Sequence, residues 1–205
     1  MGQEWEECNL GVSEQRRITM LNQKYGVVYT PDSLADFVAA LLRKFSDIKS
    51  EDVALILDSA SGECSLLRAA KKVFGESNQY VGIDVDEEVT NRTGKEFNII
   101  HNDTVLPQNV KKKTEDYWKG KMRRVDAIIA NPPWSSEKVY SRQDLSAAGF
   151  SLIAGQYDSY VLFVELGFKI LRQGGTMAFI IPDSLFDAQN EALRWFLTKN
   201  TQIKA

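Results

Sequence analysis

The sequence has little histidine, little cysteine and no excess of positive charge, and each shortage excludes a class of function. A single histidine, His101, excludes a histidine-rich metal site. The two cysteines, Cys8 and Cys64, form neither a metal-ligand spacing nor a disulfide framework. A net charge of −3 provides no overall basic field for nucleic acid. Any basic surface for DNA or RNA must therefore be local or lie on another domain.

Long apolar runs are also missing. No stretch approaches the roughly 18 residues that a membrane-spanning helix needs, and the N-terminus lacks the basic start and apolar core of a secretory signal. A hydrophobic content of 43% with 26% charged residues is typical of a globular protein, and 205 residues suffice for one well-buried domain. We expect a cytoplasmic protein with no membrane partner.

Short apolar runs alternate with helical patterns along most of the chain. This alternation predicts an α/β fold with a doubly wound, mainly parallel sheet. Strands are expected at 53–58, 80–84, 98–103, 125–130 and 176–181, with the first residues of a sixth at 202–205. Helices are expected at 30–44, 66–74, 160–171 and 185–198, the third of them ended by Gly174 and Gly175. Residues 1–24 are interpreted as a loosely ordered arm, and residues 25–205 as the domain.

The first helix has two interpretations at its start. Thr30 is a good N-cap and Pro31 fits the first helical position. Alternatively, the Thr30 hydroxyl and the helix N-terminus face a bound carboxylate. The residues alone leave both open.

Three of the expected strands end in an acid, which predicts a ligand site at one edge of the sheet. Asp58 is followed by a small-residue turn, Ser59–Ser65, and then by a helix. The turn has neither Gly-x-Gly-x-x-Gly nor Gly-Lys-Ser/Thr, so a nucleoside triphosphate site is not expected. Asp84 stands roughly 20 residues further on, where an acid accepts the hydroxyls of a ribose; the alternative is a helix cap. Asp103 is suited to accept from an adenine amine.

Asn131–Trp134, with the sequence Asn-Pro-Pro-Trp, follows the apolar run 125–130. The prolines end the strand because neither can donate to a ladder. The Asn131 amide and the Pro132 carbonyl are then fixed acceptors, and the Trp134 ring is a flat surface beside them. Two acceptors and a stacking ring suit a planar group with an exocyclic amine, such as adenine. The alternative is a turn whose tryptophan is packed for bulk.

Other stretches carry less information. The basic clusters 111–113 and 119–124 are interpreted as solvated faces, because the second directly precedes a strand and so lies at the amino end of the sheet. Residues 135–156 have no clear period and are a candidate substrate-gripping loop. His101 alternates with Ile100 and is expected to be packed.

In combination, these motifs resemble the catalytic domain of adenine-N6 DNA methyltransferases of the gamma arrangement, found in restriction-modification systems. The resemblance extends from Lys24 to the C-terminus. The segments that carry it are 26–31, 58–64, Asp84, Asp103, 131–134 and 178–184. It implies that the catalytic residues are Asn131, Pro132, Pro133 and Trp134. It implies that the residues binding S-adenosyl-L-methionine are Tyr29, Thr30, Asp58, Ala60, Gly62, Asp84, Val85 and Asp103.

The resemblance also implies partners and missing parts. The substrate would be DNA with the target adenine flipped out, no metal would be needed, and the source would be bacterial or archaeal. The last strands of this Rossmann-like fold are expected to be absent, and a C-terminal target-recognition domain or a specificity subunit is an expected partner. Ser59, Ser61 and Cys64 replace a proline, a cysteine and a glycine of the family turn. Cysteine tolerates positive φ poorly, so we expect a reshaped turn.

Alternative functions remain open at this point. The same tetrapeptide occurs in RNA adenine methyltransferases and in enzymes that methylate a protein glutamine amide. A non-catalytic cofactor-binding assembly subunit would be consistent with the altered turn. A nicotinamide oxidoreductase is disfavoured, because the glycine pattern fails and no proton-relay residue is evident.

Overall fold

The computed structural model describes residues 30–108, 111–122, 124–134 and 139–204. The arm predicted for residues 1–24, and Tyr29, lie outside the described residues. Across the described ranges, no helix is both long enough and apolar enough to span a bilayer.

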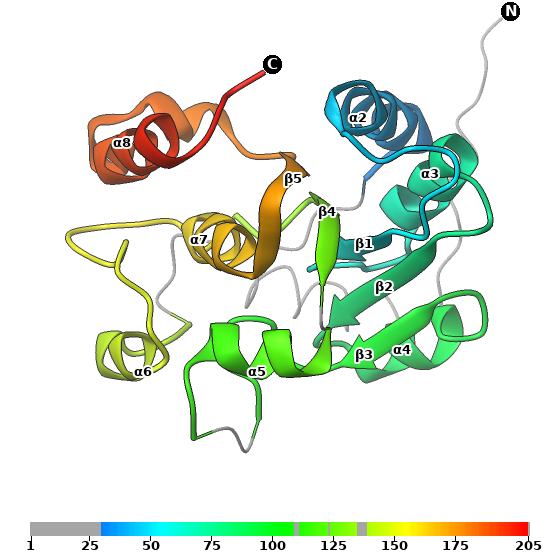
Figure 1. The fold of residues 1–205 in the computed structure, drawn as a ribbon. Coiled ribbons are helices and arrows are strands. Elements are labelled where there is room, and N and C mark those ends of the chain that lie inside the picture. Colours follow the sequence, from blue (N-terminus) through cyan, green and yellow to red (C-terminus); the bar gives the residue numbers. More distant parts are fainter. Residues whose placement is uncertain (1–29, 109–110, 123, 135–138, 205) are drawn as a thin grey trace, which may run out of the picture.

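A sheet of five parallel strands forms the centre of the molecule (Figure 1). The strands are β1 (Leu55–Asp58), β2 (Gln79–Asp84), β3 (Asn98–His101), β4 (Val125–Ala130) and β5 (Leu171–Phe179). Their order in space is β3-β2-β1-β4-β5. The chain moves outward from β1 to β3 and then returns to the other side of β1. The strand order therefore reverses between the neighbouring strands β1 and β4. In open α/β sheets, ligands bind at the carboxyl ends of the strands at such a switch point.

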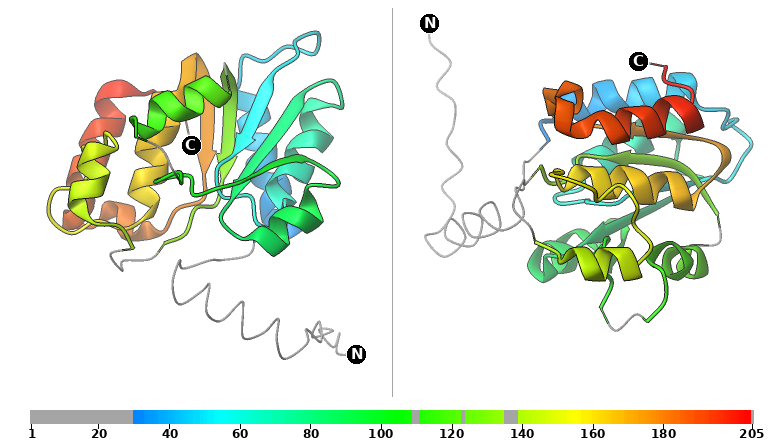
Figure 2. Two further views of the ribbon diagram at one scale, coloured as in Figure 1. Left: turned by 90° about the horizontal axis from the view of Figure 1, so that it is seen from below. Right: turned by 90° about the vertical axis from the view of Figure 1, so that its left-hand side faces the viewer.

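Helices cover both faces of this sheet, as the sequence predicted (Figures 1 and 2). One apolar cluster joins the sheet to α2 (Asp32–Phe45) and α3 (Ser65–Phe74). A second joins it to α5 (Thr114–Lys121) and α7 (Tyr160–Ile170). The remaining elements are α4 (Glu87–Thr93), α6 (Arg142–Ala147), α8 (Glu191–Asn200), η1 (Asp183–Phe186) and η2 (Ala188–Asn190).

The boundary between α7 and β5 differs from the prediction. The helix ends at Ile170 and the strand begins at Leu171, so the two glycines lie inside the strand. Gly174 has a φ of 74°, and the β4–β5 register shifts nearby. A Cβ on Gly175 would lie 2.9 Å from the Asp126 carbonyl oxygen. The glycines thus permit an irregularity and a close approach of two strands, rather than ending the helix.

Helix starts were also predicted imperfectly. Pro31, not Thr30, is the N-cap of α2, and its carbonyl accepts from the amides of Leu34 and Ala35. Helix α8 begins at Glu191 because η1 and η2 form tighter turns before it. Helix α6 lies within the stretch expected to be irregular, since six residues are too few to show a period.

Two further expectations were wrong. His101 is exposed rather than packed, and its Nε2 lies 3.2 Å from the Val85 carbonyl oxygen. Residues 202–204 form no strand, so the described end of the chain does not begin a sixth one. The exposed Lys119, Lys121 and Arg124 lie beside the amino end of β4, as expected.

A buried carboxylate holds the segment after α6 against the body of the domain. Glu165 of α7 is fully buried and accepts from the Ser151 amide at 2.8 Å and the Leu152 amide at 2.9 Å. It also accepts from the Ser151 hydroxyl and from Lys169 Nζ, each at 2.7 Å. Burial alone would raise the pKa of Glu165, but these hydrogen bonds outweigh it and lower the pKa.

We expect Glu165→Ala to lower the free energy of unfolding by about 3 kcal/mol, because it leaves buried amides without an acceptor. Since its folded pKa lies below the unfolded value, the Glu165 contribution is present at neutral pH and is lost as pH falls through the folded pKa. Urea unfolding at several pH values measures both effects. The exposed Glu51→Ala is the control, expected to change stability by less than about 0.5 kcal/mol. Equal stability of the two variants would contradict the anchoring role.

Candidate functional site

A cavity lies at the carboxyl edge of β1, β2 and β4, where the sequence predicted a ligand site. It brings together seven of the predicted site residues: Thr30, Asp58, Ala60, Gly62, Asp84, Asn131 and Pro133. Ser61, Glu63, Ser65 and Leu66, which were not predicted to be site residues, complete its lining. The sequence could have indicated them, because they belong to the predicted turn and to the first residues of the helix after it.

The turn after β1 is fastened to the end of β2. The Gly62 amide donates to Asp84 Oδ2 at 2.7 Å, and the Ser61 amide donates to the Ile83 carbonyl at 3.0 Å. Gly82 makes this approach possible, because a Cβ there would lie only 2.7 Å from Ser61 Oγ. The turn and the Asp84 carboxylate therefore form one unit.

Cys64 does not reshape the turn in the way that the sequence suggested. Its φ of 63° is the left-handed conformation that favours glycine, and it is the N-cap of α3. The side chain is fully buried among the residues under α2 and α3. Burial raises the pKa of the thiol to about 12, although a hydrogen bond with Thr93 opposes the shift. A buried thiol of this kind is a packing group rather than a nucleophile.

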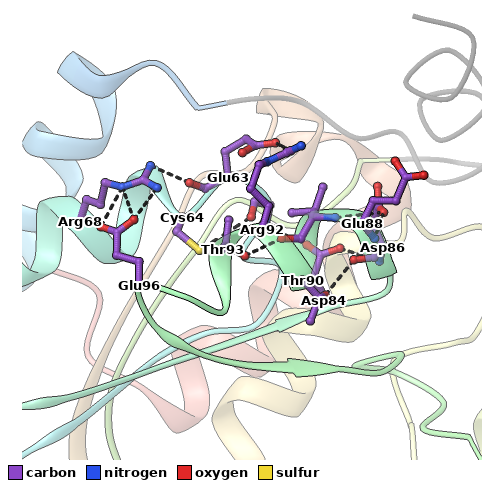
Figure 3. Close-up of polar contacts among 12 residues, drawn as sticks. Glu63, Cys64, Arg68, Asp84, Asp86, Glu88, Thr90, Arg92, Thr93 and Glu96 are labelled. Carbon is purple, nitrogen blue, oxygen red and sulfur yellow. Dashed lines mark hydrogen bonds and ion pairs between the residues drawn. The ribbon is translucent and has the colours of Figure 1, made fainter. Parts of the chain in front are cut away.

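Ion pairs join the turn and α3 to α4 and the residues after it (Figure 3). Arg68 forms an ion pair with Glu96 and donates to the Glu63 carbonyl at 2.7 Å, and Arg92 pairs with Glu63. These pairs are partly exposed, so they contribute little stability. Because Glu63 lines the cavity, they do fix the position of its rim.

Asp84 is not the cap of the following helix. Asp86 is that cap, and it accepts from the amides of Glu88 and Val89 (Figure 3). Asp84 instead accepts from the Gly62 amide and, at 2.8 Å, from the Asp86 amide. The helix-cap alternative for Asp84 is therefore wrong, and its carboxylate lines the cavity.

Two carboxylates at this edge, the buried Asp58 and the half-buried Asp84, are hard to ionise. Burial raises the pKa of Asp58 to about 7, the Ala60 amide opposes the shift, and the Asp84 charge adds to it. Burial likewise raises the pKa of Asp84 to about 6, against hydrogen bonds from the Gly62 and Val85 backbone. A cationic or hydroxyl-bearing ligand at this edge would favour the ionised forms.

Asp103 and Val85 lie near this edge but do not line the cavity. The Asp103 carboxylate accepts from the amides of Val105 and Leu106 at 2.8 and 3.1 Å. It also accepts from the Tyr140 hydroxyl, at 3.1 Å to one oxygen and 3.0 Å to the other. A base amine that approaches Asp103 must therefore share this carboxylate with Tyr140 or displace it.

Side chains and backbone from three distant segments hold the Asn-Pro-Pro-Trp tetrapeptide. Asn131 Nδ2 donates to Thr30 Oγ1 at 3.1 Å, and the Ser159 hydroxyl donates to the Pro133 carbonyl. Trp134 is half-buried, and its Nε1 donates to the Ile180 carbonyl at 3.3 Å. The ring packs against the apolar cluster around Tyr160 and does not line the cavity. Pro132 is buried and does not line the cavity.

Comparison with known proteins decides the family. The model of the Eco57I restriction-modification methylase family matches residues 22–205, which is most of the chain. The chain belongs to the Eco57I restriction-modification methylase family. The predicted resemblance to methylases of restriction-modification systems is thereby confirmed. In the described ranges, no group of three or more His, Cys, Asp or Glu residues is placed to hold a metal ion.

Two relatives of the chain are longer proteins. The chain is 29% identical over 188 residues to YtxK of Bacillus subtilis (strain 168), covering 86% of this chain and 51% of YtxK. It is 29% identical over 181 residues to the type II methyltransferase M.VspI of Vibrio sp. (strain 343), covering 83% of this chain and 40% of M.VspI. The chain thus spans about half, or less, of the length of these relatives.

Solved structures share the fold. The methyltransferase subunit of a type I restriction-modification system from Streptococcus thermophilus superposes with a TM-score of 0.63 at 17% identity. That match covers 89% of this chain and 42% of the subunit. The type IIG restriction endonuclease BpuSI superposes with a TM-score of 0.59 at 19% identity, over 83% of this chain and 22% of BpuSI. The Rossmann-like methyltransferase fold predicted from the sequence is confirmed.

We expect Cys64→Val to lower the free energy of unfolding by about 2 kcal/mol or more, because a β-branched residue is strained at positive φ. Cys64→Gly should stay within about 1 kcal/mol of the wild type, since relief of backbone strain offsets the lost buried thiol. Urea unfolding followed by fluorescence compares the two. A valine variant as stable as the glycine variant would show that the left-handed conformation does not govern this position.

Proposed function

We propose that this methylase transfers a methyl group from S-adenosyl-L-methionine to the exocyclic N6 amine of adenine in DNA. The observation that carries the proposal is the position of Asn131. It lies at the carboxyl end of β4, beside the cavity that also contains Asp84 and the turn after β1. Three features support this reaction. They are the restriction-modification methylase family, the Asn131 amide, and the Asp84 carboxylate, which is placed to bind a ribose at the same edge.

The chemistry follows from the acceptors of the tetrapeptide. The lone pair of an adenine amine is delocalised into the ring, so the nitrogen is a poor nucleophile. We assign Asn131 Oδ1 and the Pro132 carbonyl to accept the two amine hydrogens and draw the nitrogen towards tetrahedral geometry. Positive charge develops on this nitrogen during transfer, so fixed acceptors stabilise the transition state more than the ground state.

The residues of the cavity fit the proposed methyl donor. Asp84 offers a carboxylate to the hydroxyls of a ribose, and its link to the Gly62 amide holds it in place. Asp58 offers a second carboxylate, which is buried and suited to an ammonium group. The first residues of α3, Ser65 and Leu66, line the same cavity. Bound S-adenosyl-L-methionine would supply a methyl group activated by a sulfonium. We assign Asp103 and Val85, which lie beside this cavity, to bind the adenine of S-adenosyl-L-methionine.

Two further parts of the proposed reaction are the stacking of the target base and the binding of DNA. A flipped base could stack on the Trp134 ring, although its Nε1 is already engaged with Ile180. The net charge of −3 supplies little phosphate attraction. We therefore propose that site-specific methylation also uses a target-recognition domain or a specificity subunit, as the greater length of the relatives supports.

Product analysis tests the reaction. The protein, full length where the gene encodes more than this chain, is incubated with plasmid DNA and isotope-labelled S-adenosyl-L-methionine, and the DNA is then digested to nucleosides. We expect the label in N6-methyladenine by mass spectrometry. Label only in methylcytosine, in added RNA or in protein would replace the proposed substrate, and no label in any of them would remove the catalytic assignment.

We expect Asn131→Ala to lower kcat by roughly 100-fold, because it removes one hydrogen-bonding group of the transition state. Affinity for S-adenosylhomocysteine, measured by calorimetry, should stay within about threefold, since Asn131 is assigned to the amine and not to the cofactor. The exposed Asn98→Ala, at the start of β3, is the matched control and should keep full activity. An active Asn131→Ala variant would make the tetrapeptide structural.

Cofactor affinity should increase with pH across the range in which Asp84 ionises. With a pKa of about 6, Asp84 is mostly protonated at pH 5 and ionised at pH 8, and only the carboxylate accepts from both ribose hydroxyls. We expect S-adenosylhomocysteine to bind roughly tenfold more tightly at pH 8 than at pH 5.

Asp84→Asn is the control for this pH dependence, and it should bind weakly with a flatter profile. The stability of the free protein should change in the opposite direction. An acid whose folded pKa is raised stabilises the folded state at low pH, and this contribution falls as pH rises from about 4 to about 7. Affinity independent of pH in the wild type would argue against Asp84 as the ribose ligand.

A further inference from the structure

We propose that Thr30 is a positioning residue that holds the Asn131 side-chain amide in place for the target amine. This inference rests on the proposed function, because it concerns the acceptor assigned to that reaction. The two residues are 101 positions apart in the sequence and come from different elements. Thr30 precedes α2, Asn131 follows β4, and both line the same cavity.

The contact restrains the Asn131 side chain. Asn131 Nδ2 donates to Thr30 Oγ1 at 3.1 Å. The amide is planar, so a hydrogen bond to its nitrogen limits rotation of the whole group and fixes where the oxygen points. The two ends of the amide have nearly the same shape, so packing alone restrains this rotation poorly.

This restraint matters for the chemistry. An amide oxygen accepts a hydrogen from the substrate amine and stabilises the charge that develops there. An amide that turned freely would present its oxygen to the amine for only part of the time. The Thr30 hydroxyl thus keeps the acceptor in place, without itself touching the amine.

The Thr30 hydroxyl is not needed to begin the helix beside it. Pro31 is the N-cap of α2, with no side-chain cap hydrogen bond, and its carbonyl receives the amides of Leu34 and Ala35. Replacing the hydroxyl therefore removes no bond from α2. Thr30→Val keeps the β-branched shape of the side chain and removes only the oxygen, so it isolates the contact with Asn131.

The experiment compares Thr30→Val and Thr30→Ser in the wild-type protein, full length where the gene encodes more than this chain. Steady-state methylation gives kcat and KM, calorimetry gives the affinity for S-adenosylhomocysteine, and thermal unfolding gives Tm. We expect Thr30→Val to lower kcat by roughly tenfold or more, the equivalent of one neutral hydrogen bond. Thr30→Ser should recover kcat to within about threefold, because it restores the oxygen.

A second measurement does not depend on methylation. The side-chain amide resonances of Asn131 are recorded by 1H–15N NMR and assigned by their loss in Asn131→Asp. Thr30→Val should shift them, and Thr30→Ser should leave them close to the wild type. The exposed Thr198→Val, on α8, is the matched control and should change neither kcat nor these resonances.

The outcomes separate the two proposals. If the wild type methylates adenine and Thr30→Val keeps kcat within twofold, the positioning role is wrong and the proposed function stands. If both Thr30 variants lose kcat equally, or lose cofactor affinity instead, Thr30 acts through the cofactor and the inference also fails. If the wild type methylates no adenine, the proposed function fails, and unchanged Asn131 resonances in Thr30→Val would separately overturn the positioning role.

Discussion

The hydrogen bond from the Gly62 amide to the Asp84 carboxylate is the contact on which the site depends. It joins the turn after β1 to the end of β2, at 2.7 Å, and it requires that Gly82 have no side chain. Because the strands are parallel, their carboxyl ends meet at one edge, and this bond closes the edge into a cavity. The cavity is therefore a property of the packed sheet and not of the turn alone.

The cavity is built at some expense of stability. Asp58 is buried and Asp84 is half-buried, and their raised pKa values reflect the cost of removing each charge from water. The two apolar clusters on either face of the sheet offset that cost, as does the burial of long side chains such as Trp118 and Leu67. Groups that are held in an unfavourable state in the free protein are typical of ligand sites, since a ligand can relieve them.

The tetrapeptide is fixed from outside rather than by its own prolines alone. Thr30 contacts its first residue, Ser159 its third and the Ile180 carbonyl its last. These partners come from the segment before α2, the start of α7 and the end of β5. The catalytic acceptors of the proposed reaction are thus rigid because several elements meet at the end of β4, which is what electrostatic preorganisation requires.

The sequence by itself determined the α/β architecture, four strand positions to within two residues, the acids that end β1 and β2, and the tetrapeptide after β4. These features follow from local patterns, because a short apolar run bounded by turn residues is most stable as a buried strand. Only the tertiary structure decided that Asn131 donates to Thr30 and that the Tyr140 hydroxyl donates to Asp103. It also decided that Cys64 has a left-handed conformation and that Gly174 and Gly175 lie within a strand. Each of these depends on strand order and on contacts between residues distant in the chain, and no local pattern contains that information.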